Sequence, residues 1–274
     1  MRRLLIFTID VETWQPIPPG HKIDWKANIV EPLAKIEALL KQHHQRAVLM
    51  VETVELLWLR ENNPKHYDLV MNQLRAMSEH VEYGLHIHPA WRNAAIVKGV
   101  VNFKDDKYLL DLPYGEALDL LQAGSRLIKD ELGSVPRSYR GAKLHLCEKG
   151  SMNWKRRFDM LTHVGIKVDS SVLPGIQIPE WNLDYKGCPM APYYPDPEDI
   201  RKDGKQQEIR EYPISVLAGV PLDLKAIDSA FLSDQALPMF KVMLGHSKTA
   251  IDWKGLETFM KKDKLVTFGD IEGY

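Results

Sequence analysis

Cysteine is scarce in this chain of 274 residues, which has only Cys147 and Cys188. Two thiols do not make the disulfide framework of a small secreted domain, so we expect a reducing, cytoplasmic location. An excess of either charge is also missing, because 36 Lys and Arg residues stand against 37 Asp and Glu residues. Without a basic field to attract nucleic acid or an anionic membrane surface, we expect neither as a partner.

Long hydrophobic runs are absent as well. The segment MRRLLIFTIDVET begins with basic and apolar residues. Asp10 ends its apolar run after about five residues, which is too short for a signal sequence or a membrane span. No other stretch approaches about 20 apolar residues, so the sequence predicts no membrane span.

Several catalytic signatures are missing too. The glycine-rich patterns GxGxxG and GxxxxGK do not occur, which argues against a nucleotide-binding enzyme. No serine or cysteine stands out as a nucleophile.

The chain alternates between strand and helix patterns. Apolar runs predict strands at 4–10, 46–53, 81–88, 137–141, 166–171, 208–216, 240–246 and 265–269. Apolar residues at helical spacing predict helices at 29–43, 64–80, 114–133, 151–165 and 253–263. This alternation is typical of a mainly parallel sheet with outer helices, either closed into a barrel or open and doubly wound. We expect residues 1–274 to form a single domain, with a long functional loop in the Pro- and aromatic-rich stretch 172–207.

Polar side chains stand where the predicted strands end. They are Asp10, Glu12, His86, His88, Arg140, Asp169 and His246. In a parallel α/β barrel all carboxyl ends of the strands lie on one face, so these residues are expected to share a pocket. His86 and His88 point to the same face of a strand, and histidine is the commonest metal ligand.

Each of these residues also has an ordinary structural explanation. Asp10 would cap the segment after its strand, Arg140 would be a surface charge, and Asp169 would cap a turn through the sequence DSS. The argument for function is therefore the coincidence of all of them at strand ends, in a set that offers metal ligands, a base and an acid.

Five segments in order resemble the motifs of a known family. They are FTIDVET (7–13), EYGLHIH (82–88), SYRGAK (138–143), VDSSVLPG (168–175) and VMLGHS (242–247). They are similar to the motifs of the NodB-homology polysaccharide deacetylases, which are carbohydrate esterases and metal-dependent de-N-acetylases. The segment PYYPDPEDIRKDG is similar to members that act in surface-polysaccharide (O-antigen) assembly. The resemblance covers nearly the whole chain and implies a distorted (β/α) barrel of about seven to eight parallel strands with outer helices.

Two positions depart from the family pattern. The usual second motif spaces its histidines four apart, but the residue four after His86 is Ala90. The usual first motif has adjacent acids, but Val11 separates Asp10 from Glu12. Either His88 serves as the second histidine ligand or the site has one ligand fewer.

The resemblance implies a role for each polar residue. Glu12, His86 and His88 are expected to bind a divalent metal, most simply zinc. Asp10 is implied to be the general base. The three further implied roles are that Arg140 holds Asp10, His246 is the general acid, and Asp169 orients His246.

Other groups are expected to contact the substrate. A backbone N–H just after Arg140 is implied to face the oxyanion. The apolar faces of sugar rings are expected to lie against Trp14, Trp91, Tyr193 and Tyr194.

The implied activity is hydrolysis of an N-acetyl group on an amino sugar of a polysaccharide or its precursor, in cell-surface polysaccharide biosynthesis. Two alternatives stay open: a metal-free amidase of the same fold, and a degenerate saccharide-binding module without activity. The second is disfavoured because acid, base and orienting partners are all retained.

Overall fold

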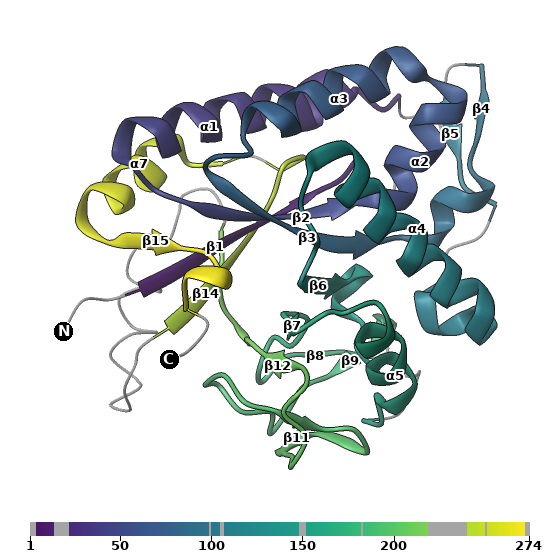
Figure 1. Cartoon of the computed structure of the whole chain (residues 1–274), viewed down its shortest axis with the longest axis vertical. Helices are drawn as coiled ribbons and strands as arrows, with labels where there is room; N and C mark the ends of the chain where they lie inside the picture. The colour runs from purple at the N-terminus through teal and green to yellow at the C-terminus, as the bar shows by residue number, and fades with distance from the viewer. Residues whose placement is uncertain are drawn as a thin grey trace.

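The computed structural model describes residues 4–13, 22–98, 100–104, 107–147, 152–181, 183–218, 240–249 and 251–271. Its centre is a curled parallel sheet in the order β12-β7-β6-β3-β2-β1-β14-β13, with β15 beside β1 (Figure 1). These strands are β1 (Leu4–Val11), β2 (Ala47–Glu52), β3 (Val81–Ile87), β6 (Ser138–Gly141), β7 (Val168–Asp169), β12 (Arg210–Glu211), β13 (Ile214–Leu217), β14 (Phe240–His246) and β15 (Lys264–Val266).

The sheet closes because one stretch of chain belongs to both of its ends. β12 pairs with β7 and β13 pairs with β14, although only Tyr212 and Pro213 separate the two strands. Proline has no N–H to donate, so the ladder is interrupted there. The N–H of Ile214 donates to the carbonyl of Val172 at 2.7 Å and keeps this corner attached near β7. The expected distorted (β/α) barrel is confirmed, and the open alternative is not formed.

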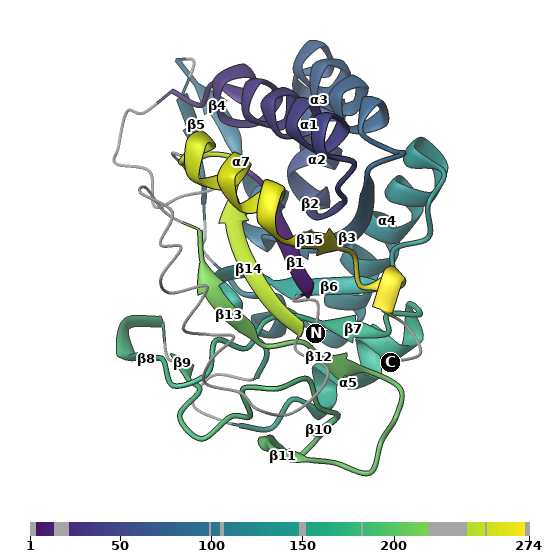
Figure 2. The same ribbon diagram turned by 90° about the vertical axis from the view of Figure 1, so that its left-hand side faces the viewer.

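Helices lie around the outside of this sheet. They are η1 (Lys26–Val30), α1 (Glu31–His43), α2 (Thr53–Asn62), α3 (Pro64–Ala76), α4 (Tyr114–Leu132), α5 (Lys155–His163) and α7 (Trp253–Lys262). Helices α1 and α3 run side by side over one flank, whereas α5 lies at the opposite end near β7 (Figures 1 and 2). Pro32 lies in the first turn of α1, directly after η1. Gly133 ends α4 in a left-handed conformation with φ 67°.

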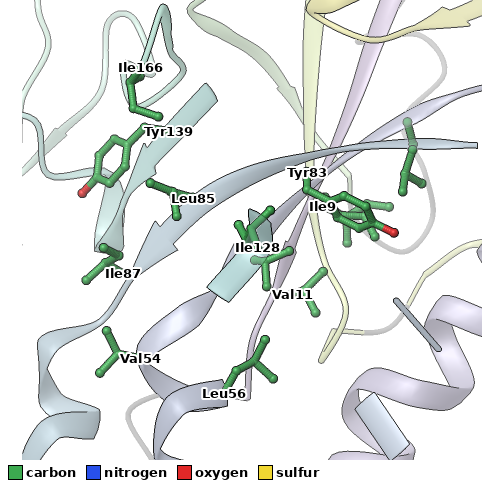
Figure 3. Packing of buried hydrophobic residues seen from close by; sticks show 14 of the residues in the cluster. Ile9, Val11, Val54, Leu56, Tyr83, Leu85, Ile87, Ile128, Tyr139 and Ile166 are labelled. Atoms are coloured by element: carbon green, nitrogen blue, oxygen red, sulfur yellow. The ribbon is translucent and has the colours of Figure 1, made fainter. Parts of the chain in front are cut away.

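The two faces of the strands have different neighbours. Ile9 and Val11 of β1 belong to one apolar cluster with Val54 and Leu56 of α2, and Figure 3 shows Val11 toward Leu56 and Ile87 toward Val54. Alternate residues of β1 face the other way, and Ile6 belongs to a second apolar cluster inside the barrel. The even-numbered residues of β1 and β3 therefore point inward, and the last of them open onto the carboxyl end of the barrel.

The stretch 172–207, expected as one long loop, contains short antiparallel pairs. One pair is β8 (Gln177–Ile178) with β9 (Leu183–Asp184), and the other is β10 (Pro195–Asp196) with β11 (Asp199–Asp203). A further hairpin joins β4 (Ala95–Val97) to β5 (Val100–Asn102). Among the helices of the described ranges, none combines the length and apolar character needed to cross a bilayer.

Candidate metal centre

Neighbouring strands bring the polar residues together at the carboxyl end of the barrel. In the sheet register Asp10 of β1 lies beside His246 of β14, and His86 of β3 lies beside Arg140 of β6. Glu12 and His88 extend just past the ends of β1 and β3. Residues that are up to 236 positions apart in sequence thus meet in one place, as strand-end logic predicts.

Glu12, His86 and His88 each bring one donor atom to the same spot. Oε2 of Glu12 lies 2.7 Å from Nε2 of His88 and 3.4 Å from Nε2 of His86. The two Nε2 atoms are 3.1 Å apart, and all three side chains are buried. Together they form a candidate metal-binding set.

The donor atoms fit one small divalent ion. Tetrahedral ligands about 2.1 Å from zinc lie ~3.4 Å from one another. The separation of Glu12 from His86 equals this value, at 3.4 Å, whereas the other two separations, at 3.1 and 2.7 Å, are shorter. Nδ1 of His86 lies 2.9 Å from the carbonyl oxygen of Arg140, so it donates its proton there and leaves the Nε2 lone pair for a metal. Among the described residues, Oε2 of Glu12 has no hydrogen-bond partner apart from the two imidazoles that face it.

The electrostatic environment of this centre suits a cation. Burial raises the pKa of Glu12, but His88 and Lys248 outweigh that effect and hold the pKa well below its usual range. Burial lowers the pKa of His86, but Asp10 and Glu12 outweigh it and raise that pKa to about 9. Burial lowers the pKa of His88 to about 4. A cation bound here would contact the ionised carboxylate of Glu12 and the neutral imidazole of His88. It would displace the proton from the imidazole of His86.

Lys248 is a member of the site that the sequence motifs did not reveal. Its Nζ donates to Oε1 of Glu12 at 2.7 Å, and its side chain is only 10% exposed. The two oxygens of Glu12 therefore have different partners, the lysine on Oε1 and the imidazoles on Oε2. The available signal was its position two residues after His246, just past the end of β14.

Asp10 is held by Arg140 on one oxygen and faces His246 with the other. Nη1 of Arg140 donates to Oδ1 of Asp10 at 2.8 Å. Arg140 is itself held by Ser170, which accepts at its carbonyl oxygen at 2.7 Å and at Oγ at 3.0 Å. Oδ2 of Asp10 lies 3.7 Å from Nε2 of His246, and that nitrogen also lies 3.7 Å from Oε1 of Glu12. His246 thus lies near both Asp10 and Glu12, and 33% of its side chain is exposed.

The backbone N–H after Arg140 is already engaged. Gly141 donates this N–H to Oγ of Ser171 at 2.8 Å. In this conformation the N–H of Gly141 is therefore not available to donate to an oxyanion.

Asp169 lies beside Glu211 rather than beside His246. The two acids are opposite each other on β7 and β12, and both are fully buried. Burial raises the pKa of both acids, and Asp169 raises that of Glu211 further. Among the contacts of the described residues, none joins Asp169 to His246. The family resemblance implies that Asp169 orients His246, but no contact between the described residues supports this role.

The aromatic residues expected at the substrate lie in different surroundings. Trp14 falls outside the described residues. Trp91 is fully buried against Trp58 and Phe103, with ring centroids 5.1 and 4.9 Å away, so it offers no surface to a sugar. Tyr193 is buried and donates its hydroxyl to the carbonyl of Ile200 at 2.6 Å.

Tyr194 differs from these because it is only partly buried. Its ring lies 5.7 Å from the guanidinium of Arg210. Tyr193 and Tyr194 both belong to the β10–β12 region, and none of their contacts among the described residues reaches the metal centre.

Comparison with solved structures finds proteins of similar fold. The chain is similar to a candidate polysaccharide deacetylase from Mycobacterium smegmatis, with a TM-score of 0.58 and 14% identity, over 98% of this chain and 88% of that one. It is also similar to a 4-alpha-glucanotransferase from Thermococcus litoralis, with a TM-score of 0.57 and 14% identity, over 98% of this chain and 40% of that one.

A third similar structure is a CE4 family pseudoenzyme from Bacillus anthracis. Its TM-score is 0.50 at 12% identity, over 98% of this chain and 65% of that one. Comparison with protein-family profiles and with curated sequences gives no match. At these identities the likeness establishes the fold, and the same fold serves more than one activity.

Proposed function

We propose that this chain is a metal-dependent hydrolase that removes an N-acetyl group from an amino sugar of a polysaccharide or its precursor. One observation carries the proposal: the donor set of Glu12, His86 and His88 lies directly beside the Asp10–Arg140 pair. A metal ligand set next to a held carboxylate can supply both the polarisation and the base that hydrolysis of an amide needs. The fold shared with a candidate polysaccharide deacetylase supports the same substrate class.

Amide hydrolysis is difficult for two reasons. An amide carbonyl is a poor electrophile, and an amine is a poor leaving group. A zinc-like ion in the donor set supplies Lewis-acid polarisation of the carbonyl and acidification of water. Asp10 takes the proton of the attacking water on Oδ2, since Arg140 occupies Oδ1. Arg140 itself acts on Asp10 and not on the substrate.

His246 completes the proton path. Burial lowers its pKa, against the opposing effect of Asp10 and Glu12, and this favours the neutral imidazole. Its Nε2 lies 3.7 Å from Oδ2 of Asp10 and can receive the proton that Asp10 has taken. His246 then delivers this proton to the leaving amine.

The biological setting follows from the motifs and the cysteines. The segment PYYPDPEDIRKDG favours a role in surface-polysaccharide assembly, including O-antigen. Cys147 and Cys188 are both free and buried, which agrees with a reducing cytoplasm and with a precursor as the substrate.

Acetate release tests the proposed activity. Protein loaded with zinc is expected to release acetate from N-acetylglucosamine oligosaccharides, and protein stripped with a chelator is expected to lose this activity and regain it with zinc. Binding of the saccharide without acetate release, with zinc, cobalt or manganese present, would overturn the proposal in favour of a saccharide-binding module.

One observation favours a second candidate, a metal-free amidase. Lys248 already places a positive charge on Glu12, at 2.7 Å. Full acetate release from exhaustively chelated protein would select this candidate, because no metal ion would then be present to polarise the carbonyl.

A further inference from the structure

Two buried acids at the start of α2 lie next to the chain segments that carry the metal ligands. Glu52 is the last residue of β2 and the N-cap of α2, and Glu55 lies in the first turn of that helix. Both side chains are 1% exposed. Strand β2 lies between β1 and β3, the two strands that carry Glu12 and the histidines.

Glu52 holds the backbone of His88. Its Oε1 accepts the N–H groups of Val54 at 2.9 Å and Glu55 at 3.2 Å, which caps the helix. Its Oε2 accepts the backbone N–H of His88. The ladder between β2 and β3 ends at the pair of Glu52 and His86, so the N–H of His88 has no further β2 strand to bond. The carboxylate takes the place of the missing acceptor.

Glu55 holds the other ligand strand in the same way. Its Oε2 accepts the backbone N–H of Thr13 at 2.9 Å, and its Oε1 accepts the hydroxyl of Thr13. Oε1 also accepts the indole N–H of Trp25 at 2.7 Å. Thr13 follows Glu12 directly and lies beyond the end of β1.

We propose that Glu52 and Glu55 are positioning residues that set the geometry of the metal ligands, Glu52 through His88 and Glu55 through Thr13 and Glu12. This inference rests on the proposed metal centre. One helical turn thus fixes both segments that leave the sheet to reach the centre. Glu52 explains how a histidine two residues after His86 reaches the same ion, because it holds the peptide of His88 where the strand has already ended.

The sharpest test separates the two roles of Glu52. Glu52→Asp keeps a good N-cap for α2. Its carboxylate is one methylene shorter, so it loses the reach to the N–H of His88. Glu55→Gln removes one of the two acceptor oxygens that hold Thr13 and Trp25. Loss of a group that orients a metal ligand typically weakens metal affinity about 10–100-fold, and we expect this loss of zinc affinity in both variants by calorimetric titration.

Glu82→Gln is the matched control. Glu82 is a partly buried acid on β3, and it accepts from Gly269 and Ser138 near the other end of that strand. This variant is expected to keep the zinc affinity of the wild type even where its thermal stability falls.

The visible absorption spectrum of the cobalt-substituted protein is the second readout, since it reports ligand geometry and not stability. We expect it to change in Glu52→Asp and Glu55→Gln and to stay the same in Glu82→Gln. Wild-type zinc affinity and cobalt spectra in the first two variants would overturn the inference while the metal centre stands. A wild type that binds no zinc would instead remove the metal centre on which the inference rests.

Discussion

Asp10 is the residue on which the proposed chemistry depends most. Asp10→Asn keeps the size of the side chain and an oxygen for Arg140, but it removes the base. The donor set of Glu12, His86 and His88 is untouched, so zinc binding is expected to persist. General-base catalysis contributes typically about 10²–10⁴-fold, and we expect acetate release to fall by this factor. Undiminished turnover of the zinc-loaded variant would remove Asp10 as the base.

The sequence identified the residues whose position at a strand end is enough to place them. Asp10, His86, Arg140 and His246 belong to this group, because parallel strands bring their carboxyl ends together whatever the details of packing. Lys248 and Glu52 could not be found in this way. Their roles depend on which oxygen of which neighbour a long side chain reaches, and that is set by the order of strands in the sheet.

The aromatic residues show a case in which the sequence suggested a substrate contact that the structure does not have. Trp91 follows the histidine segment directly, which made it a candidate for the substrate. In the structure the turn η2 (Pro89–Asn93) carries its ring into the core against Trp58. A tryptophan in a loop sequence gives no information about which side of the chain it faces.

Helix α2 is one of the elements that the sequence patterns did not predict. It follows β2 without a break, and most of its residues are buried, including Val54, Glu55, Leu56 and Trp58. A helix that is buried nearly all round lacks the polar stripe that helical periodicity requires. The helices α1, α3, α4, α5 and α7 each have such a stripe, and each was predicted.

The packing of α4 (Tyr114–Leu132) gives a prediction with a built-in control. A Cβ at Gly124 would lie 2.3 Å from Oγ1 of Thr53 and 3.2 Å from Leu85. Gly124→Ala is therefore expected to lower the free energy of unfolding by about 1–3 kcal/mol, because overpacking outweighs the gain in helix propensity. Gly115 lies in the first turn of the same helix and has nothing within 4 Å. Gly115→Ala is expected to raise that free energy by up to about 1 kcal/mol. Urea denaturation checks both variants, and a stabilised Gly124→Ala would refute the close approach of α4 to α2.

The pairing of β7 with β12 predicts a pH dependence of stability. Burial raises the pKa of Glu211 well above its usual range, and Asp169 raises it further. The folded chain then binds more protons than the unfolded chain, whose Glu has a pKa of about 4.3. The stabilisation from this pair is fully present below that value and is lost as pH rises through the raised pKa.

Glu211→Gln removes this titration and keeps an oxygen for the N–H of Val172, which now donates to Oε1 at 3.0 Å. The wild type is therefore expected to lose stability relative to the variant as pH rises from about 5 to 9. Urea denaturation of both proteins, in the presence of chelator at a series of pH values, measures this difference. Parallel curves would show that the two acids do not share a proton.

The closure of the whole barrel goes beyond the sequence patterns. Residues 208–216 were predicted as one strand, but Pro213 divides them into β12 and β13, which pair with opposite ends of the sheet. The pattern of apolar residues indicates that a strand exists. It does not indicate which strands pair with it. The direct pairing of β14 with β1 places His246, at the end of β14, beside Asp10.

The zinc content of the whole protein tests the central claim most directly. The wild type, His86→Ala and His88→Ala would each be stripped with chelator, reloaded with zinc and measured by elemental analysis after removal of unbound metal. The account predicts about one zinc ion per wild-type chain and a strong loss of bound zinc in each variant, since each lacks one of three protein ligands. Full occupancy in both variants would contradict the account.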